Sequence, residues 1–391
     1  MRNNQFLIII LSSLLSAFII SPVISQPFQI GHVTLQLVDS SRNNRQIPAE
    51  VYYPAVMAGE EVPVAPGQFP VLSFGHGFVM TVDAYTNFSD ALVPGGFIFV
   101  LANTETSFSP SHSEFALDLS FIIHAMALAN TNPGSIFYGA VGQSSAVMGH
   151  SMGGGASLLA AGSDTTITAV VNFAAANTTP SAISASSNIS IPSLLFAGSE
   201  DCVAPPSQHQ EIMYDSLASS CKTLISITGG GHCYFANDNF LCTFGENSCG
   251  PDLTITREEQ QDVTFSFLIP WLNFFLKANQ DSWEIFTDSL ISSQRIDYQQ
   301  DCELTRIQEK GTGQLELKVY PVPFKDYIRV DGNFSLRLIK IYDLSGQEVF
   351  SGKPGEHFPF EFSIAFLNPG VYQLVFTSEN GHKITRKAFK F

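Results

Sequence analysis

One serine lies in a setting that could support nucleophilic chemistry. The run G-H-S-M-G places Ser151 between Gly149 and Gly153. The strand-forming run S-A-V-M at 145–148 precedes it and helix formers at 156–161 follow, so the pattern predicts a strand, a sharp turn and a helix. Side chains at the two glycine positions would collide with the neighbouring strand and helix at such a turn. The pattern therefore predicts Ser151 as the nucleophile of a serine hydrolase.

A serine hydroxyl becomes a good nucleophile only when a base removes its proton, and a carboxylate must orient that base. In folds with this turn, the acid and then the histidine follow the serine along the chain. One apolar run ends shortly before Asp201, and the next ends at three glycines directly before His232. We therefore predict Asp201 as the acid and His232 as the base. Glu200 is an alternative acid, and an ordinary surface turn would also explain either carboxylate.

Acyl transfer also needs two N–H groups that stabilise the negative oxygen of the tetrahedral intermediate. The residue after the nucleophile, Met152, supplies one of them in this type of turn. The segment F-G-H-G-F at 74–78 follows an earlier apolar run and resembles the H-G-x turn of esterases and lipases. We assign the second donor to the Phe78 amide, with Gly77 as the alternative.

The predicted site requires a sheet that brings these loops together. Two alternating segments, at 33–38 and 47–54, predict antiparallel strands at the start of the sheet. Continuous apolar runs, which suit parallel strands covered on both faces, follow at 70–74, 96–102, 146–149, 167–175, 191–197 and 222–228. Helical patterns occupy 112–129, 206–217 and a segment from Thr256, where Glu259 completes a capping box, through Lys277. The alternation predicts an α/β-hydrolase fold with a doubly wound, mostly parallel sheet.

The chain divides into segments of different character. Arg2 and an apolar stretch at 6–20 predict a secretory signal. Residues 303–314 are polar and contain glycine, as expected of a linker, and short alternating strands with turn signals follow. We expect a signal peptide at 1–25, a catalytic domain at 26–302, the linker at 303–314 and a small immunoglobulin-like β-sandwich at 315–391.

Charge separates the two modules and narrows the partners. Residues 1–300 carry 7 Lys and Arg against 24 Asp and Glu, a net charge of −17, whereas residues 301–391 carry 12 against 11, a net charge of +1. The acidic part would repel nucleic acids and anionic membrane surfaces, so an uncharged substrate fits better. We expect a monomer that needs no cofactor.

All six cysteines lie in one hundred-residue stretch, at positions 202, 221, 233, 242, 249 and 302. Export favours disulfides, and fifteen pairings are open if all six are oxidised. The spacing lacks paired C-x-x-C knuckles, which disfavours zinc. We therefore expect disulfides and no metal site.

The chain from about residue 33 to residue 277 resembles the bacterial cutinases and poly(ethylene terephthalate) hydrolases, within the broader dienelactone-hydrolase-like esterases. The resemblance is carried by G-H-S-M-G-G at 149–154, E-D-C-V-A-P at 200–205, G-G-H at 230–232 and S-P-S-H-S at 109–113. It implies that Ser151, Asp201 and His232 form the triad. It also implies that Phe78 both donates to the oxyanion and packs on the acyl ring of the substrate, with His150 and Met152 as further substrate contacts.

One feature near the predicted site departs from the family pattern, and another suggests a disulfide. The loop at 177–181 lacks the tryptophan that this family often stacks on an aromatic ring. Cys202 and Cys233 each directly follow a predicted triad residue, so a bridge between them would tie the acid loop to the base loop; we treat that pairing as a hypothesis. A disulfide closing a loop of that length would stabilise the fold by roughly 2 to 4 kcal/mol.

The C-terminal module resembles the type A sorting domain of Bacteroidetes type IX secretion. The resemblance is carried by Y-P-V-P at 320–323, I-Y-D-L-S-G-Q-E-V at 341–349, L-N-P-G-V-Y at 367–372 and K-A-F-K-F at 387–391. It implies export through the periplasm by the type IX machinery, followed by removal of the module or attachment at the cell surface. A carbohydrate-binding or adhesion sandwich is the competing reading.

Together these expectations describe a secreted serine carboxylic-ester hydrolase that works through an acyl-enzyme on an ester or polyester substrate. Two alternatives remain open: a lipase or small-ester esterase without polymer activity, and a catalytically silent surface-binding protein.

Overall fold

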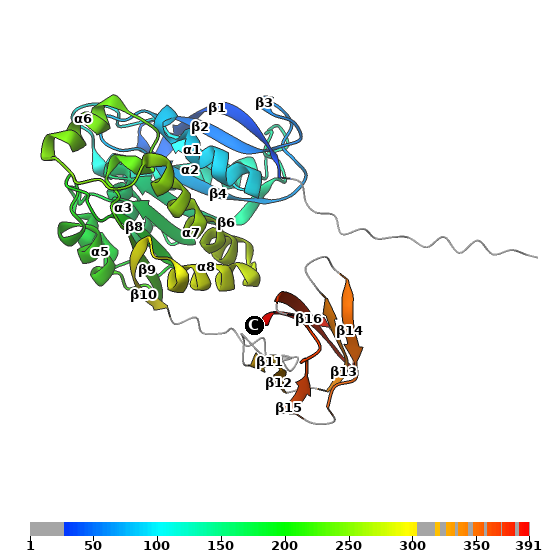
Figure 1. The fold of residues 1–391 in the computed structure, drawn as a ribbon. Coiled ribbons are helices and arrows are strands. Elements are labelled where there is room, and N and C mark those ends of the chain that lie inside the picture. Colours follow the sequence, from blue (N-terminus) through cyan, green and yellow to red (C-terminus); the bar gives the residue numbers. More distant parts are fainter. Residues whose placement is uncertain are drawn as a thin grey trace, which may run out of the picture. The chain divides into compact units, whose positions relative to one another are not determined.

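The computed structural model describes residues 27–302 and, with short gaps, residues 317–390 (Figure 1). They form two compact units, one on each side of the boundary between Leu304 and Thr305. The expected signal peptide and linker lie outside the described residues. Among the helices that the structure describes, none is both long and apolar enough to cross a membrane.

The first unit is built on one mixed sheet whose strands run in the order β10-β9-β8-β7-β6-β4-β5-β2-β1-β3. Neighbours from β5 through β4 to β9 are parallel, whereas β1, β2 and β10 pair antiparallel with their neighbours in β2, β5 and β9. The strands are β1 (Gln29–Asp39), β2 (Arg45–Ala55), β3 (Gly59–Glu60), β4 (Phe69–Gly75), β5 (Ile98–Ala102), β6 (Val141–His150), β7 (Ala169–Phe173), β8 (Ser193–Gly198), β9 (Cys221–Ile227) and β10 (Ile296–Cys302). The expected mostly parallel sheet is confirmed.

Helices cover both faces of this sheet (Figure 1). They are α1 (Thr86–Leu92), α2 (His112–Ala129), α3 (Met152–Ser163), α4 (Ala182–Ser186), α5 (Gln210–Ser216), α6 (Phe240–Cys249), α7 (Arg257–Lys277) and α8 (Gln280–Ser292). One apolar core joins the sheet to α2, α3, α4 and α5, and a second joins it to α1, α7 and α8. Successive strand residues alternate between the two, as Val147 and Met148 do, because side chains of a strand point to opposite faces.

The predicted helix at residues 112–129 has those bounds in the structure, and α7 begins at the predicted capping box of Thr256 and Glu259 and continues through Pro270. Several elements were not expected, among them α6, α8 and the edge strand β10. The residues of β10 are almost all exposed, so it lacks the apolar run that marks the buried strands.

The second unit contains two small antiparallel sheets that share one core. One sheet has the order β11-β12-β15 and the other β14-β13-β16-β17. The strands are β11 (Leu317–Tyr320), β12 (Tyr327–Gly332), β13 (Leu336–Tyr342), β14 (Glu348–Gly352), β15 (Phe360–Ser363), β16 (Gly370–Ser378) and β17 (Lys383–Lys390). Ile328 of the first sheet and Ile341 and Phe376 of the second lie in the same buried cluster, which confirms the predicted sandwich.

Candidate active site

The predicted site residues follow four parallel strands. Phe78 follows β4, Ser151 follows β6, Asp201 follows β8 and His232 follows β9. Carboxyl ends of parallel strands meet at one edge of a sheet, where ligands of open α/β folds bind. The fold therefore gathers all four segments at the same edge.

Ser151 occupies the sharp turn between β6 and α3. Its backbone has φ 53° and ψ −117°, a conformation that L-residues rarely adopt. A Cβ added at Gly149 would collide with the Gly153 carbonyl, and one added at Gly153 would collide with the Gly75 carbonyl of β4. The glycines therefore allow strand β4, strand β6 and helix α3 to approach closely enough to hold the strained serine at the sheet edge.

Asp201 and His232 contact each other directly. The His232 Nδ1 atom lies 2.8 Å from Asp201 Oδ2, and both side chains are buried. The other carboxylate oxygen accepts the amides of Val203 and Ala204. Burial alone would raise the pKa of Asp201, but the neighbouring His232 and these hydrogen bonds outweigh it and lower that pKa. Glu200, the alternative acid, instead accepts a hydrogen bond from the Ser199 hydroxyl.

His150, directly before the serine, links the loops of the site. Its Nε2 lies 2.9 Å from the His232 carbonyl, an acceptor only, so Nε2 carries the proton and Nδ1 accepts the Tyr85 hydroxyl proton at 2.9 Å. Tyr85 Oη in turn accepts the Gly77 amide at 2.8 Å. Complete burial, with a smaller effect from His232, lowers the pKa of His150 to about 3, in keeping with the neutral ring that this chain of bonds requires.

This burial corrects the expectation that His150 contacts the substrate. Its side chain has no exposed surface, and both ring nitrogens are bonded within the protein. A ring in that position orients the two loops instead.

The segment after β4 carries an exposed aromatic residue. Phe78 is 45% exposed, and its ring lies 6.2 Å from that of Phe108 in an edge-to-face arrangement. The Gly77 amide is engaged by Tyr85, which favours Phe78 over Gly77 as an oxyanion donor. Met152 begins α3, where the first amides of a helix have no partner within the helix. Its side chain is almost entirely buried, so the backbone is the part placed to act.

Helices α6 and α7 hold the loop that carries His232. The buried Glu246 carboxylate of α6 accepts the amides of His232 and Cys233, at 2.5 and 3.1 Å. Gln260 of α7 accepts the Gly231 amide and donates to the Gly231 carbonyl, both at 2.9 Å. The base loop is thus fixed by side chains from two helices.

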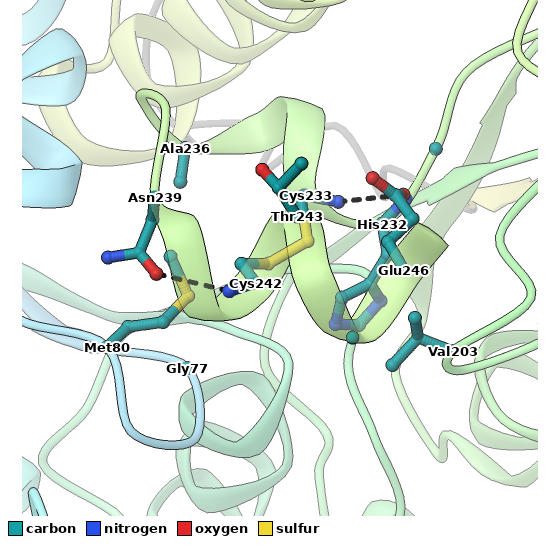
Figure 2. The surroundings of a disulfide bond; sticks show 12 residues. Gly77, Met80, Val203, His232, Cys233, Ala236, Asn239, Cys242, Thr243 and Glu246 are labelled. Atoms are coloured by element: carbon teal, nitrogen blue, oxygen red, sulfur yellow. Dashed lines mark hydrogen bonds between the residues drawn. A yellow bond between two sulfur atoms is a disulfide. The ribbon is translucent and has the colours of Figure 1, made fainter. Parts of the chain in front are cut away.

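The disulfides correct the hypothesised Cys202–Cys233 bridge. The pairs are Cys202–Cys249, Cys233–Cys242 and Cys221–Cys302, and no cysteine is free. Helix α6 carries both Cys242 and Cys249, so each loop is tied to this helix and not to the other loop. Figure 2 shows the Cys233–Cys242 bridge beside His232 and Glu246.

Sequence reasoning missed Tyr85 and Glu246. Tyr85 gives no local signal, because its partners are distant in the chain. Glu246 does give one: Cys242, Glu246 and Cys249 recur at i, i+4 and i+7, a spacing that places them on one face of a helix. The described residues contain no group of three or more His, Cys, Asp or Glu side chains placed to hold a metal ion.

The mostly parallel sheet, the helices on both of its faces and the serine elbow after β6 define an α/β hydrolase. A family model described as PET hydrolase-like matches residues 31–245, more than half of the chain. The chain belongs to this PET hydrolase-like family. A second model, described as a secretion system C-terminal sorting domain, matches residues 318–390. The C-terminal unit is therefore a type IX sorting domain, which directs export to the cell surface or out of the cell.

Proposed function

We propose that this hydrolase is a serine carboxylesterase that cleaves polyesters through an acyl-enzyme on Ser151. The observation that carries the proposal is the buried Asp201–His232 pair beside the strained Ser151 elbow, at the edge where the loops of β4, β6, β8 and β9 meet. Membership of the PET hydrolase-like family supports an ester substrate.

In the proposed reaction, His232 acts as the general base. Asp201 holds Nδ1 of the ring, so Nε2 is the nitrogen left to take the proton from Ser151 Oγ. The serine oxygen attacks the ester carbonyl carbon and forms a tetrahedral intermediate. The protonated His232 then gives its proton to the departing alcohol oxygen as the C–O bond breaks. Water attacks the acyl-serine in the same way, releases the acid and restores Ser151.

The amides of Phe78 and Met152 are the proposed donors to the oxyanion. Tyr85 supports this role, because its bonds to the Gly77 amide and the His150 ring connect the Phe78 loop to the residue before the nucleophile. A donor group that is already positioned pays no reorganisation cost as negative charge develops on the oxygen. The exposed ring of Phe78 is the proposed contact for the acyl part of the substrate.

The test is hydrolysis of p-nitrophenyl butyrate by Ser151→Ala. We expect a loss of about 10⁴-fold or more in kcat, because no other group replaces the nucleophile. Asp201→Asn should lower kcat by about 10³- to 10⁴-fold, because the histidine would take the wrong tautomer. Glu200→Gln is the matched control and should retain near-native turnover. The assignment would be overturned if Ser151→Ala kept its activity and unfolded, as followed by circular dichroism, at the same temperature as the native protein.

A further inference from the structure

Helix α6 is covalently tied beside the proposed catalytic loops. Its Cys242 is bonded to Cys233, which directly follows His232, and its Cys249 is bonded to Cys202, which directly follows Asp201. A helix tied at two points in this way has little freedom to leave the site. The exposed side chains of α6 are therefore held next to the site.

The side of α6 away from these loops is apolar and exposed. Phe240 is 78% exposed, Leu241 43% and Phe244 67%, and the two rings stack with centroids 6.2 Å apart. We call these three residues the α6 aromatic face. Glu246 is the only charged residue of the helix and it is buried, so no charge from α6 reaches the exposed side.

The start of helix α6 lies near the loop that carries Phe78. Asn87 Nδ2 donates to the Phe235 carbonyl, and the Asn237 amide donates to the Ala84 carbonyl, which joins the segment before α6 to the segment after that loop. Figure 2 places Gly77 and Met80 in the surroundings of the Cys233–Cys242 bridge.

Further exposed apolar side chains occur in the loops of the same site. They are Phe78 at 45%, Phe108 at 79% and Val203 at 43%. Exposed apolar side chains gathered around a site are typical of a binding surface, since soluble proteins rarely expose a large apolar patch without a partner.

We propose that the α6 aromatic face is a contact surface for the solid polyester substrate, which holds the polymer against the protein while one chain enters the site of Ser151. The proposal rests on the proposed ester hydrolysis. An uncharged aromatic polyester offers rings that stack on Phe240 and Phe244, and it carries no charged groups that need a partner on this face. An anionic membrane is disfavoured as the occupant, because residues 1–300 carry a net charge of −17.

The test separates polymer contact from chemistry by using a soluble and a solid substrate. In Phe240→Ser/Phe244→Ser, we expect adsorption to an amorphous poly(ethylene terephthalate) film, and product release from it, to fall by about tenfold, since two aromatic contacts are lost. The kcat/KM for p-nitrophenyl butyrate should stay within about twofold of native, because neither ring belongs to the catalytic machinery.

Leu128→Ser/Tyr138→Ser is the matched control. These side chains are 70% and 57% exposed, and they lie near the end of α2 and just before β6, at the opposite edge of the sheet. This control should adsorb to the film and hydrolyse it like the native protein.

Several results would overturn the proposal. They are native film adsorption by the α6 double variant, equal losses on film and soluble ester, equal losses in the control variant, or no film adsorption by the native protein. If the α6 double variant changed only in its binding of neutral phosphatidylcholine vesicles, the face would be assigned to lipid. If it changed only in elution volume in size-exclusion chromatography, the face would be assigned to contact with a second copy of the chain. Either result would also overturn the proposal. The Ser151→Ala assay on soluble ester tests the proposed hydrolysis by itself, so a failure of the proposed function can be distinguished from a failure of the surface proposal.

Discussion

His150 shows how one buried residue can serve a site without contacting the substrate. It is the last residue of β6, directly before Ser151, and its ring joins Tyr85 to the His232 carbonyl. Because a carbonyl can only accept, Nε2 carries a proton, and complete burial, which lowers the pKa of this ring, keeps it neutral. Protonating Nδ1 would remove the acceptor for Tyr85 and place a charge on a completely buried ring.

We predict that His150 makes the protein less stable in mild acid. Below its ordinary pKa of 6.5 the unfolded chain binds a proton at this residue, whereas the native protein does not until about pH 3. The unfolded state then binds more protons, so the free energy of unfolding should fall by up to about 1.4 kcal/mol per pH unit as pH drops through this window. Above pH 6.5 the contribution should be constant.

The measurement is the free energy of unfolding by urea at pH 4.5, 5.5, 6.5 and 7.5 for His150→Gln. The absolute stability of this variant will fall, but its slope between pH 4.5 and 6.5 should be shallower than in the native protein. Leu128→Ser, at an exposed position without an ionisable group, is the control and should keep the native slope. Equal slopes in all three proteins would refute the prediction.

At the scale of elements, the sequence predicts the parts whose signal is local. The buried strands are continuous apolar runs. The elbow is marked by Gly149 and Gly153, because a side chain at either position would collide with neighbouring backbone in this type of turn. Strand β10 and helix α6 carry no such run. The disulfide pairing depends on where α6 packs, which is set by contacts between distant segments, so proximity of Cys202 and Cys233 to the triad residues gave the wrong pair.

Glu246 is the link between α6 and the base loop. We predict that Glu246→Ala lowers kcat for p-nitrophenyl butyrate by about tenfold and destabilises the protein by about 1 to 3 kcal/mol, because the amides of His232 and Cys233 lose their acceptor. Glu246→Gln keeps an acceptor oxygen and should recover most of the activity. The measurements are steady-state kinetics and urea unfolding.

Glu284→Ala is the control for the loss of one negative charge, since this exposed residue of α8 makes no contact with the base loop in the described part of the chain. It should leave kcat and stability unchanged. The positioning role would be contradicted if Glu246→Ala were destabilised but kept its native kcat, or if Glu246→Gln were as slow as Glu246→Ala.

At the scale of the whole molecule, two units with separate cores serve separate tasks. The hydrolase unit has apolar cores on both faces of its sheet, and the sorting domain has its own core between two small sheets. The last strand of the hydrolase unit, β10, pairs with β9 along its whole length and ends at Cys302, which is bonded to Cys221. The last strand of the hydrolase sheet is therefore complete before the sorting domain begins.

We predict that a chain ending at Cys302 keeps the kcat/KM of the full protein for p-nitrophenyl butyrate within about twofold, and its Tm within about 2 °C, because the hydrolase unit has its own apolar cores. A chain ending at Arg295 is the informative control. It lacks β10, exposes the edge of β9 and leaves Cys221 without its partner across 81 residues, which should cost roughly 2 to 5 kcal/mol and favour aggregation. Differential scanning calorimetry and size-exclusion chromatography on the three proteins distinguish the outcomes. If the chain ending at Cys302 also loses stability or aggregates, the sorting domain is part of the folding unit of the hydrolase, and its removal after export would inactivate the enzyme.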